Sequence, residues 1–350
     1  MSNMLEETRQ QPETLRRTLE RGLRDIRSLE LRLKKDPPRL VVIAARGTSD
    51  NAAQFGRYLI EITTGIPVSL AAPSIATLYK RGGDRRGVLV IGISQSGEST
   101  DTNAVLADGR ERGATTLGIT NEPASTMAKT AEYTLLVRAG KEKSVAATKT
   151  YTGQLMALYL LAAALGGGVR AEQLRQIPDR VDAVLRREAA IAETTERYRF
   201  MNGTVIVGRG LNYANALEFG LKLMETCYVL AERFSGADLL HGPIAMVERG
   251  FPVFVFAPGG PTWPSISAVL RQLNELKADM LVITGRGNKH ARGLGRTIEL
   301  PPLPAAPGIP DLYTPIPYII PAQLFAAHLA RIKGFDPDRP RTLSKITRTM

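Results

Sequence analysis

An internal repeat constrains the fold of this chain more than any other feature of its sequence. Similar residues recur after 163 or 164 positions, with one residue inserted in the second copy. The two copies match as Ile43–Gly47 with Ile206–Gly210, as Phe55-Gly56 with Phe219-Gly220, and as Glu61 with Glu225. Such self-similarity predicts a duplicated domain, and 350 residues are enough for two domains with a core each.

Short apolar runs alternate with helix-compatible segments through the first copy. We expect buried strands, with helices between them, at residues 40–45, 67–71, 88–93, 115–119 and 133–137. Strands separated by helices are joined by right-handed crossovers and form a parallel sheet that is covered on both faces. The expected fold class is therefore α/β, with two tandem domains that each contain a five-stranded parallel sheet.

Composition marks the expected boundaries between these parts. Asp36-Pro-Pro38 should end an N-terminal helical arm, and Gly166-Gly-Gly168 should end the first domain. We expect the arm over residues 1–38, the first domain over 39–166, a charged helical connector over 167–199, the second domain over 200–334 and a C-terminal tail over 335–350. The tail has too few apolar residues for a core. It is either disordered or folded over a site, to which it would deliver Lys345.

Composition also excludes several classes of protein. The net charge of +12 suits nucleic acid, but acidic residues lie between the basic ones and aromatic residues make up only 6% of the chain. We therefore expect no nucleic-acid partner. No apolar run reaches the ~18 residues of a membrane helix and the N-terminus is acidic, so we expect a cytoplasmic protein without a membrane partner. A single cysteine, Cys227, excludes an intrachain disulfide, and no metal-ligand spacing is present; we expect neither a metal nor another cofactor.

A hydroxyl-rich turn follows the apolar run 88–93. Ser94, Ser96 and Ser99 surround one glycine at an expected helix start, where unpaired N–H groups and the helix dipole favour an anion by roughly 0.3–1 kcal/mol. Such clusters are also common as caps and turns, so both interpretations stay open. The corresponding segment of the second copy, residues 253–264, lacks these hydroxyls, so only the first copy is expected to bind phosphate.

Three charged residues interrupt an otherwise apolar helix in the second copy. Glu218, Lys222 and Glu225 follow at steps of four and three, which places them on one helix face. They form either an ordinary salt-bridged stripe on the helix surface or part of a functional site. Downstream, His241 precedes Gly-Pro and is either a turn residue or a catalyst.

Six motifs in order resemble the sugar isomerase (SIS) family, in particular the double-SIS isomerase half of glutamine:fructose-6-phosphate amidotransferase (glucosamine-6-phosphate synthase). The motifs occupy residues 45–49, 94–98, 144–149, 216–225, 241–243 and 340–345. This resemblance implies two tandem SIS domains with flavodoxin-like sheets.

The resemblance also implies a binding site for a sugar 6-phosphate substrate. Its phosphate and sugar contacts would be Gly47, Thr48, Ser49, Ser94, Gln95, Ser96, Ser99, Val145 and Ala147. Glu225 would move a proton between C1 and C2 of the open-chain sugar, a role worth roughly 10² to 10⁴ in rate. His241, oriented by Glu218, would open the ring from the partner subunit of a homodimer. Lys222 would be a polar partner in the site, and Lys345 would contact the sugar carbonyl.

Three positions depart from the synthase pattern: Arg46 replaces a cysteine, Ala147 a serine and Leu230 a histidine. We expect no glutaminase domain and therefore no glutamine-dependent synthesis. The expected enzyme is an SIS-type glucosamine-6-phosphate deaminase that forms fructose 6-phosphate and ammonia. The alternatives are a synthase-like isomerase, a fructosamine-6-phosphate deglycase and a ketose/aldose-phosphate isomerase. A non-catalytic sugar-phosphate sensor is a further alternative, but a sensor has no use for the base.

Overall fold

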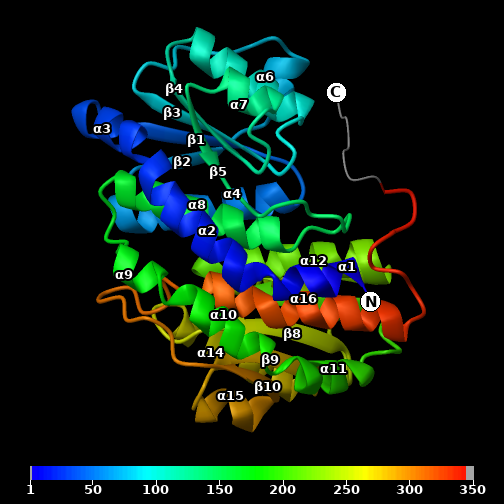
Figure 1. Ribbon diagram of the computed structural model, residues 1–350. Helices are drawn as coiled ribbons and strands as arrows, with labels where there is room; N and C mark the ends of the chain where they lie inside the picture. The colour runs from blue at the N-terminus through cyan, green and yellow to red at the C-terminus, as the bar shows by residue number, and fades with distance from the viewer. Residues whose placement is uncertain (1, 344–350) are drawn as a thin grey trace. The chain divides into compact units, whose positions relative to one another are not determined.

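The computed structural model describes residues 2–343 of the chain (Figure 1). Its contacts divide the chain into two units. One unit contains residues 13–142 and 147–175 and holds the first sheet; the other contains residues 1–12, 143–146 and 176–342 and holds the second. We refer to them below as the first-sheet unit and the second-sheet unit.

The first sheet is parallel, with the strand order β2-β1-β3-β4-β5. Its strands are β1 (Leu40–Ala44), β2 (Val68–Leu70), β3 (Val88–Ser94), β4 (Thr115–Thr120) and β5 (Tyr133–Leu136). Each lies within one residue of the predicted bounds at either end. The register pairs Leu40 with Val88 and Ala44 with Gly92. All seven residues of β3 are buried, which explains its unbroken apolar run.

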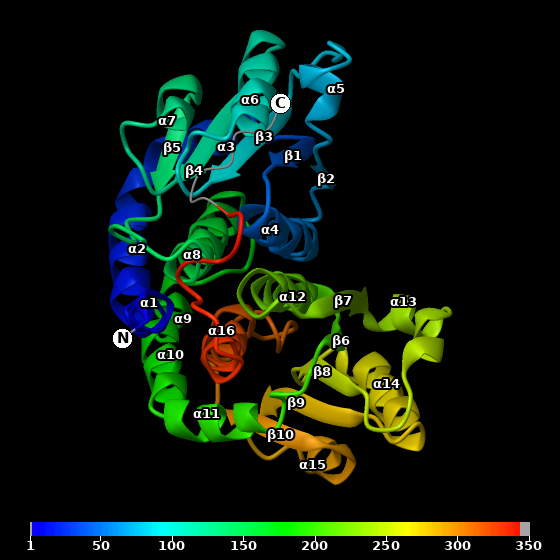
Figure 2. The same ribbon diagram turned by 90° about the vertical axis from the view of Figure 1, so that its right-hand side faces the viewer.

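Helices cover both faces of this sheet. Figure 2 shows α4 (Thr48–Thr64) and α8 (Lys149–Ala164) on one side and α6 (Thr100–Glu111) and α7 (Thr126–Thr130) on the other. The shorter helices α5 (Ser74–Thr77) and α9 (Ala171–Leu174) lie in the connections. Almost every residue of α8 is buried, so its apolar composition reflects a central helix of the unit.

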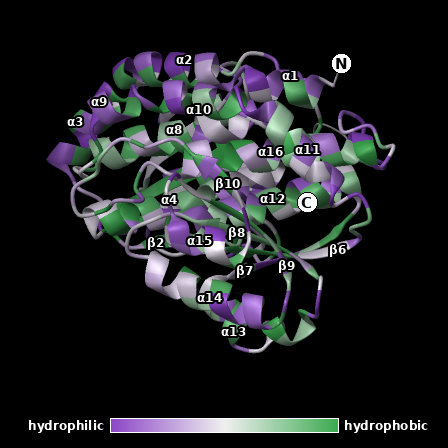
Figure 3. Ribbon diagram, turned by 90° about the horizontal axis from the view of Figure 1, so that it is seen from below, coloured by the Kyte–Doolittle hydropathy of each residue, from purple (hydrophilic) through white to green (hydrophobic). Residues whose placement is uncertain are grey.

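The N-terminal residues, predicted as one helical stretch, form three helices: α1 (Asn3–Arg9), α2 (Gln11–Asp25) and α3 (Arg27–Lys35). Pro12 lies in the first turn of α2, where a missing N–H costs nothing. Figure 3 shows hydrophilic and hydrophobic segments alternating along α2, because Leu15 and Leu19 are buried while its arginines face solvent.

The second sheet repeats the topology of the first. Its order β10-β9-β8-β6-β7 becomes the order of the first sheet when it is read from β7 to β10. The strands are β6 (Gly203–Gly208), β7 (Leu230–Ser235), β8 (Pro252–Ala257), β9 (Asp279–Gly285) and β10 (Arg296–Leu300). The predicted duplication and fold class are therefore confirmed.

The second-sheet unit also contains helices on both faces of its sheet. They are α10 (Ile177–Leu185), α11 (Glu188–Glu196), α12 (Tyr213–Cys227), α13 (Gly236–Leu240), α14 (Trp263–Glu275), α15 (Lys289–Leu294) and α16 (Pro315–Ile332), with short 3₁₀ turns at Gly210–Asn212 and Pro243–Met246. The connector predicted over residues 167–199 is helical, but it contains three helices, α9, α10 and α11, where its sequence pattern suggested a pair. No helix among residues 2–343 is both long and apolar enough to cross a bilayer.

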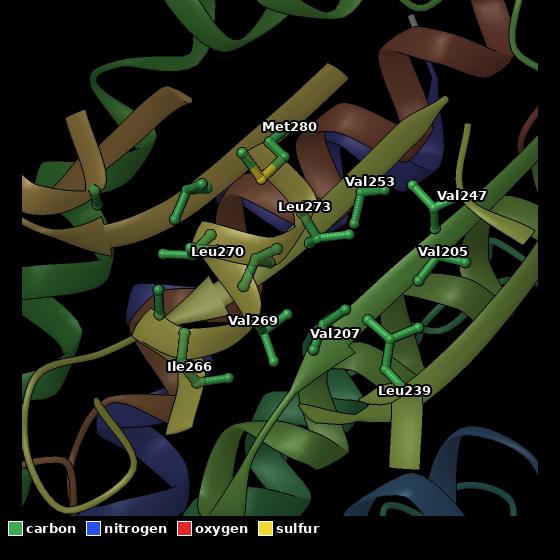
Figure 4. Close-up of a cluster of buried hydrophobic side chains, with 14 residues drawn as sticks. Val205, Val207, Leu239, Val247, Val253, Ile266, Val269, Leu270, Leu273 and Met280 are labelled. Atoms are coloured by element: carbon green, nitrogen blue, oxygen red, sulfur yellow. The ribbon is translucent and has the colours of Figure 1, made fainter. Parts of the chain in front are cut away.

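Alternate residues of β8 face two different cores. Val253 points toward α14, and Figure 4 shows the cluster that it joins. That cluster takes side chains from β6, β8, β9, α13 and α14: Val205, Val207, Val253, Met280, Leu239, Ile266, Val269, Leu270 and Leu273. Phe254 faces the other way and packs against Phe219 of α12 and Phe325 of α16, with ring centroids 5.1 and 5.0 Å apart. These aromatic contacts fix the position of α12 against its sheet.

The described part of the C-terminal tail is held by specific contacts within the second-sheet unit. The Asp338 carboxylate accepts hydrogen bonds from the N–H groups of Asn3, at 2.6 Å, and Met4, at 2.8 Å, and so caps α1. The Arg341 guanidinium lies 4.4 Å from the centre of the Tyr228 ring. Residues 335–342 are thus held within this unit.

Candidate active site

The serine-rich turn begins at the carboxyl end of β3. Ser94 is buried, and its Oγ accepts a hydrogen bond from the N–H of Gly97 at 3.1 Å. Gly97 has φ +67°, and a Cβ there would lie 2.2 Å from the Ser125 hydroxyl, so this position requires glycine. Ser99 is the N-cap residue of α6, with its Oγ 3.0 Å from Thr102 Oγ1. The first N–H groups of α6 therefore start beside the hydroxyls of the turn.

The second hydroxyl-containing turn begins at the carboxyl end of β1. Gly47 is the N-cap residue of α4 and has φ +57°, Thr48 is half-buried, and Ser49 is buried. Ser49 Oγ accepts a hydrogen bond from Gln154 Nε2 at 2.9 Å. Strands β1 and β3 are neighbours, and the strand order reverses between them. The structure thus brings both predicted turns to the switch point, where sheets of this kind bind ligands.

An ion pair joins the starts of α4 and α6 at this switch point. Arg46 directly precedes the N-cap of α4, and its Nη2 donates to Oδ2 of Asp101 in the first turn of α6 at 2.6 Å. Arg46 was expected as a departure from the family pattern, close to the sugar, where it would influence the choice of substrate. The structure shows that it has a charged partner from the other turn.

A cleft of about 420 Å³ opens beside the serine turn in the same unit. It is lined by the predicted site residues Gln95 and Ser96 and also by Glu98, Glu122, Lys141 and Glu142. Glu98 accepts the N–H of Thr126, at 2.9 Å, so it caps α7. Three carboxylates around one lysine make this cleft a poor place for a phosphate, and the helix starts at the switch point suit the anion better.

Val145 and Ala147 lie in the loop that precedes α8. Val145 is half-buried and Ala147 is buried. Glu142 begins the loop and caps α8, because its Oε1 accepts the N–H groups of Thr148, at 2.9 Å, and Thr150, at 3.2 Å. The loop is therefore shaped by a buried carboxylate at its start.

The charged residues of α12 form a buried group in the second-sheet unit. Lys222 Nζ lies 2.6 Å from Glu225 Oε2 and 3.5 Å from Glu218 Oε1. Lys222 and Glu218 are fully buried, whereas 22% of the Glu225 side chain is exposed. The predicted helix face is confirmed, and its burial excludes the alternative of a solvated salt-bridge stripe. Glu225 is the member of this group that a ligand can reach.

His241 lies elsewhere in the second-sheet unit. It ends α13, is exposed, and its backbone N–H donates to the Asp238 carbonyl at 3.2 Å. The next residue, Gly242, has φ +137°. Lys345, the predicted tail lysine, lies outside the described residues.

Sequence reasoning missed two side chains that support the predicted turns. Gln154 supports Ser49 from 105 positions away, and its signal was a polar residue in an almost wholly apolar helix. Asp101 pairs with Arg46 across 55 positions, and nothing local distinguished it from any acidic residue in the first turn of a helix.

Comparison with known proteins identifies the family. The sequence profile of the SIS domain matches residues 36–164 and 202–333, one match for each copy of the repeat. A glutamine–fructose-6-phosphate aminotransferase (isomerizing) from Pyrococcus horikoshii is 37% identical over 350 aligned residues. The alignment covers 98% of this chain but only 57% of the length of that relative.

Two solved structures show the same fold. The C-terminal domain of glucosamine-fructose-6-phosphate aminotransferase from Francisella tularensis has a TM-score of 0.87 and 28% identity, covering 97% of this chain and 98% of that one. Glucosamine-6-phosphate deaminase from Thermotoga maritima has a TM-score of 0.72 and 21% identity, covering 97% and 100%; at that identity the likeness shows the fold alone. With two matched sequence segments and two sheets of the same topology, this chain belongs to the SIS domain family.

Proposed function

We propose that this chain is a sugar-phosphate isomerase-type enzyme that acts on amino-sugar phosphates. Its reaction is the conversion of glucosamine 6-phosphate to fructose 6-phosphate and ammonia. The observation that carries the proposal is the Lys222 ammonium, buried and 2.6 Å from a Glu225 carboxylate that stays partly exposed. Burying charged groups costs roughly several kcal/mol each before pairing offsets it, and buried charged groups beside a partly exposed carboxylate are typical of functional sites.

In the proposed reaction Glu225 moves one proton between neighbouring carbons. It removes the proton from C2 of the open-chain amino sugar and returns it to C1. The C1 oxygen gains a proton and the amino nitrogen loses one, so the C1 aldehyde passes through an enolamine to a C1 alcohol with a C2 imine. Water then adds to the imine carbon, and ammonia leaves as the C2 carbonyl forms. One water is consumed for each ammonia released. Lys222 holds the base in place, and Lys345 contacts the sugar carbonyl.

The hydroxyl-rich turns are proposed to bind the 6-phosphate. Ser94 Oγ already accepts from Gly97, so its own proton is available to donate to a phosphate oxygen. The proposed contacts at the two turns are Gly47, Thr48, Ser49, Ser94, Gln95, Ser96 and Ser99, with Val145 and Ala147 beside the sugar. Replacing Ser94 and Ser96 together by alanine should weaken binding of fructose 6-phosphate by roughly 1.5–3 kcal/mol for each hydrogen bond lost. Unchanged affinity would place the phosphate elsewhere.

His241 is proposed to open the sugar ring in the site of a partner subunit, with Glu218 orienting it. Its exposure at the end of α13 is compatible with that role. Mixing the inactive variants Glu225→Gln and His241→Ala tests the arrangement. A shared site in a homodimer restores about a quarter of the wild-type activity, since half of the dimers are mixed and each has one intact site. No recovery would show that both groups act within one chain.

A panel of sugar 6-phosphates, scored for ammonia and for ketose, tests the reaction itself. We expect both products from glucosamine 6-phosphate. Glu225→Gln should abolish turnover while calorimetry still detects sugar-phosphate binding, and Glu232→Gln, an exposed carboxylate of β7, should remain active. Absence of ammonia from every amino-sugar phosphate contradicts the deaminase. Ketose without ammonia would then indicate an isomerase, and binding without any product a sensor.

A further inference from the structure

The ion pair at the switch point joins residues that differ strongly in burial. The Asp101 side chain is 6% exposed and that of Arg46 is 52% exposed. Nε and Nη2 of Arg46 both donate to Oδ2 of Asp101, at 3.2 and 2.6 Å. Oδ1 of Asp101 is buried and has no hydrogen-bond partner among residues 2–343. The exposed guanidinium therefore compensates a carboxylate that the surrounding protein solvates poorly.

The position of this carboxylate creates an electrostatic problem for an anion site. Asp101 lies in the first turn of α6, beside the serine turn, where its charge would repel an incoming dianion. A guanidinium in direct contact cancels most of that repulsion. Without Arg46, the helix start that suits a phosphate would carry an uncompensated negative charge.

Arg46 also keeps donors for a ligand. A guanidinium has five N–H donors in one plane, and Asp101 occupies two of them. The remaining donors belong to a half-exposed side chain between the turns after β1 and β3. Their planar arrangement suits two oxygens of one phosphate, which a single hydroxyl cannot match.

We propose that Arg46 is a phosphate-binding residue that selects phosphate esters over neutral sugars, and that Asp101 is a positioning residue that holds its guanidinium at the switch point. The inference rests on the proposed function, because it takes the phosphate of the sugar as the ligand. It adds a charged contact to a site otherwise built from hydroxyls and backbone N–H groups.

Titration calorimetry with inorganic phosphate and with fructose 6-phosphate tests this assignment. The variant is Arg46→Ala combined with Asp101→Asn, since removal of the arginine alone would leave the buried carboxylate uncompensated. The control is Arg57→Ala combined with Glu61→Gln, an ion pair on α4 whose arginine side chain is 50% exposed. Both double variants remove one positive and one negative charge. Thermal melting of each variant first establishes that it is folded.

We expect Kd for both ligands to rise about 10- to 100-fold in the switch-point variant and less than about twofold in the control. Asp101→Asn alone should raise KM for the sugar phosphate with little change in kcat. In the Arg46→Ala background the same substitution should lower Kd, because it removes a carboxylate charge that no longer has its guanidinium partner. A merely structural role of Asp101 would weaken binding in both backgrounds and would contradict the positioning role.

The failures of the two proposals are distinguishable. One outcome is that the wild-type chain binds and converts the sugar phosphate while the Kd of the switch-point variant lies within about twofold of the Kd of the control. The role of Arg46 is then overturned and the proposed function stands. If the wild type binds neither phosphate nor fructose 6-phosphate and forms no product, both are overturned.

Discussion

Replacing Lys222 by methionine should destabilise the second-sheet unit more than the substitution of an exposed charged residue elsewhere in that unit. Methionine preserves most of the side-chain length but removes the ammonium that lies 2.6 Å from Glu225 and 3.5 Å from Glu218. Two carboxylates then share one face of α12 without their common cation. One of them, Glu218, is fully buried and cannot turn to solvent.

The expected loss follows from that burial. Removing one partner of a buried ion pair costs about 3–5 kcal/mol, against about 0–1 kcal/mol for an exposed pair. A domain of 150–250 residues loses roughly 2–4 °C in Tm for each kcal/mol, so we expect Tm to fall by about 6–20 °C. The aromatic packing of Phe219 against Phe254 is unchanged by the substitution and should keep the helix in place.

Two further variants separate charge from packing. Combining Lys222→Met with Glu218→Gln should recover most of the lost stability, because neutral groups of similar size often replace buried ion pairs at little cost. Arg271→Met, on α14, removes a positive charge from an exposed residue and should change stability by less than about 0.5 kcal/mol. Chemical denaturation at neutral pH, followed by circular dichroism, measures each difference. A loss below about 1 kcal/mol for Lys222→Met, or no recovery in the double variant, would refute the reasoning.

Two other predictions concern the serine turn and acid stability. Gly97→Ala should destabilise the first-sheet unit and weaken fructose 6-phosphate binding, because its Cβ would lie 2.2 Å from the Ser125 hydroxyl. Gly140→Ala is the control: Gly140 has φ +66° and its Cβ would meet nothing within 4 Å, so this variant measures the backbone strain of about 1 kcal/mol alone. Equal losses of unfolding free energy in the two variants would argue against the clash. Burial lowers the pKa of His328, so the unfolded chain binds more protons just below pH 6.5 and stability rises with pH there. His328→Gln should flatten the dependence of the unfolding free energy on pH just below pH 6.5, and an unchanged slope would exclude His328 as its source.

The strands and the fold class could be predicted because their signals are local. A buried parallel strand requires a continuous apolar run, and β3 shows one that ends at the first serine of the turn. The face shared by Glu218, Lys222 and Glu225 also followed from spacing alone, since helix geometry sets it. Their burial did not, because it depends on how α12 packs in the folded unit, where its contacts with β8 and α16 join residues far apart in the sequence.

The ends of the helices, and the residues that cap them, were less predictable from the sequence. Pro12 indicated a helix start near the beginning of α2, but the interruption at Ile26 carries no glycine or proline of its own, so the sequence does not mark where α2 ends. The cap of α1 comes from Asp338, 335 positions away, and a local pattern cannot reveal such a partner. The same applies to Gln154, which supports Ser49 from α8.

By itself, the sequence determined the duplication, the two parallel sheets and the residue types at each turn. Apolar periodicity and glycine positions act over a few residues, and the duplication is visible when the two halves of the sequence are aligned. Only the tertiary structure decided which charges are buried and which residues meet. Arg46 and Asp101 are 55 positions apart, yet β1 and β3 lie side by side and bring them within 2.6 Å. A contact of that kind depends on strand order, and strand order is a property of the whole sheet.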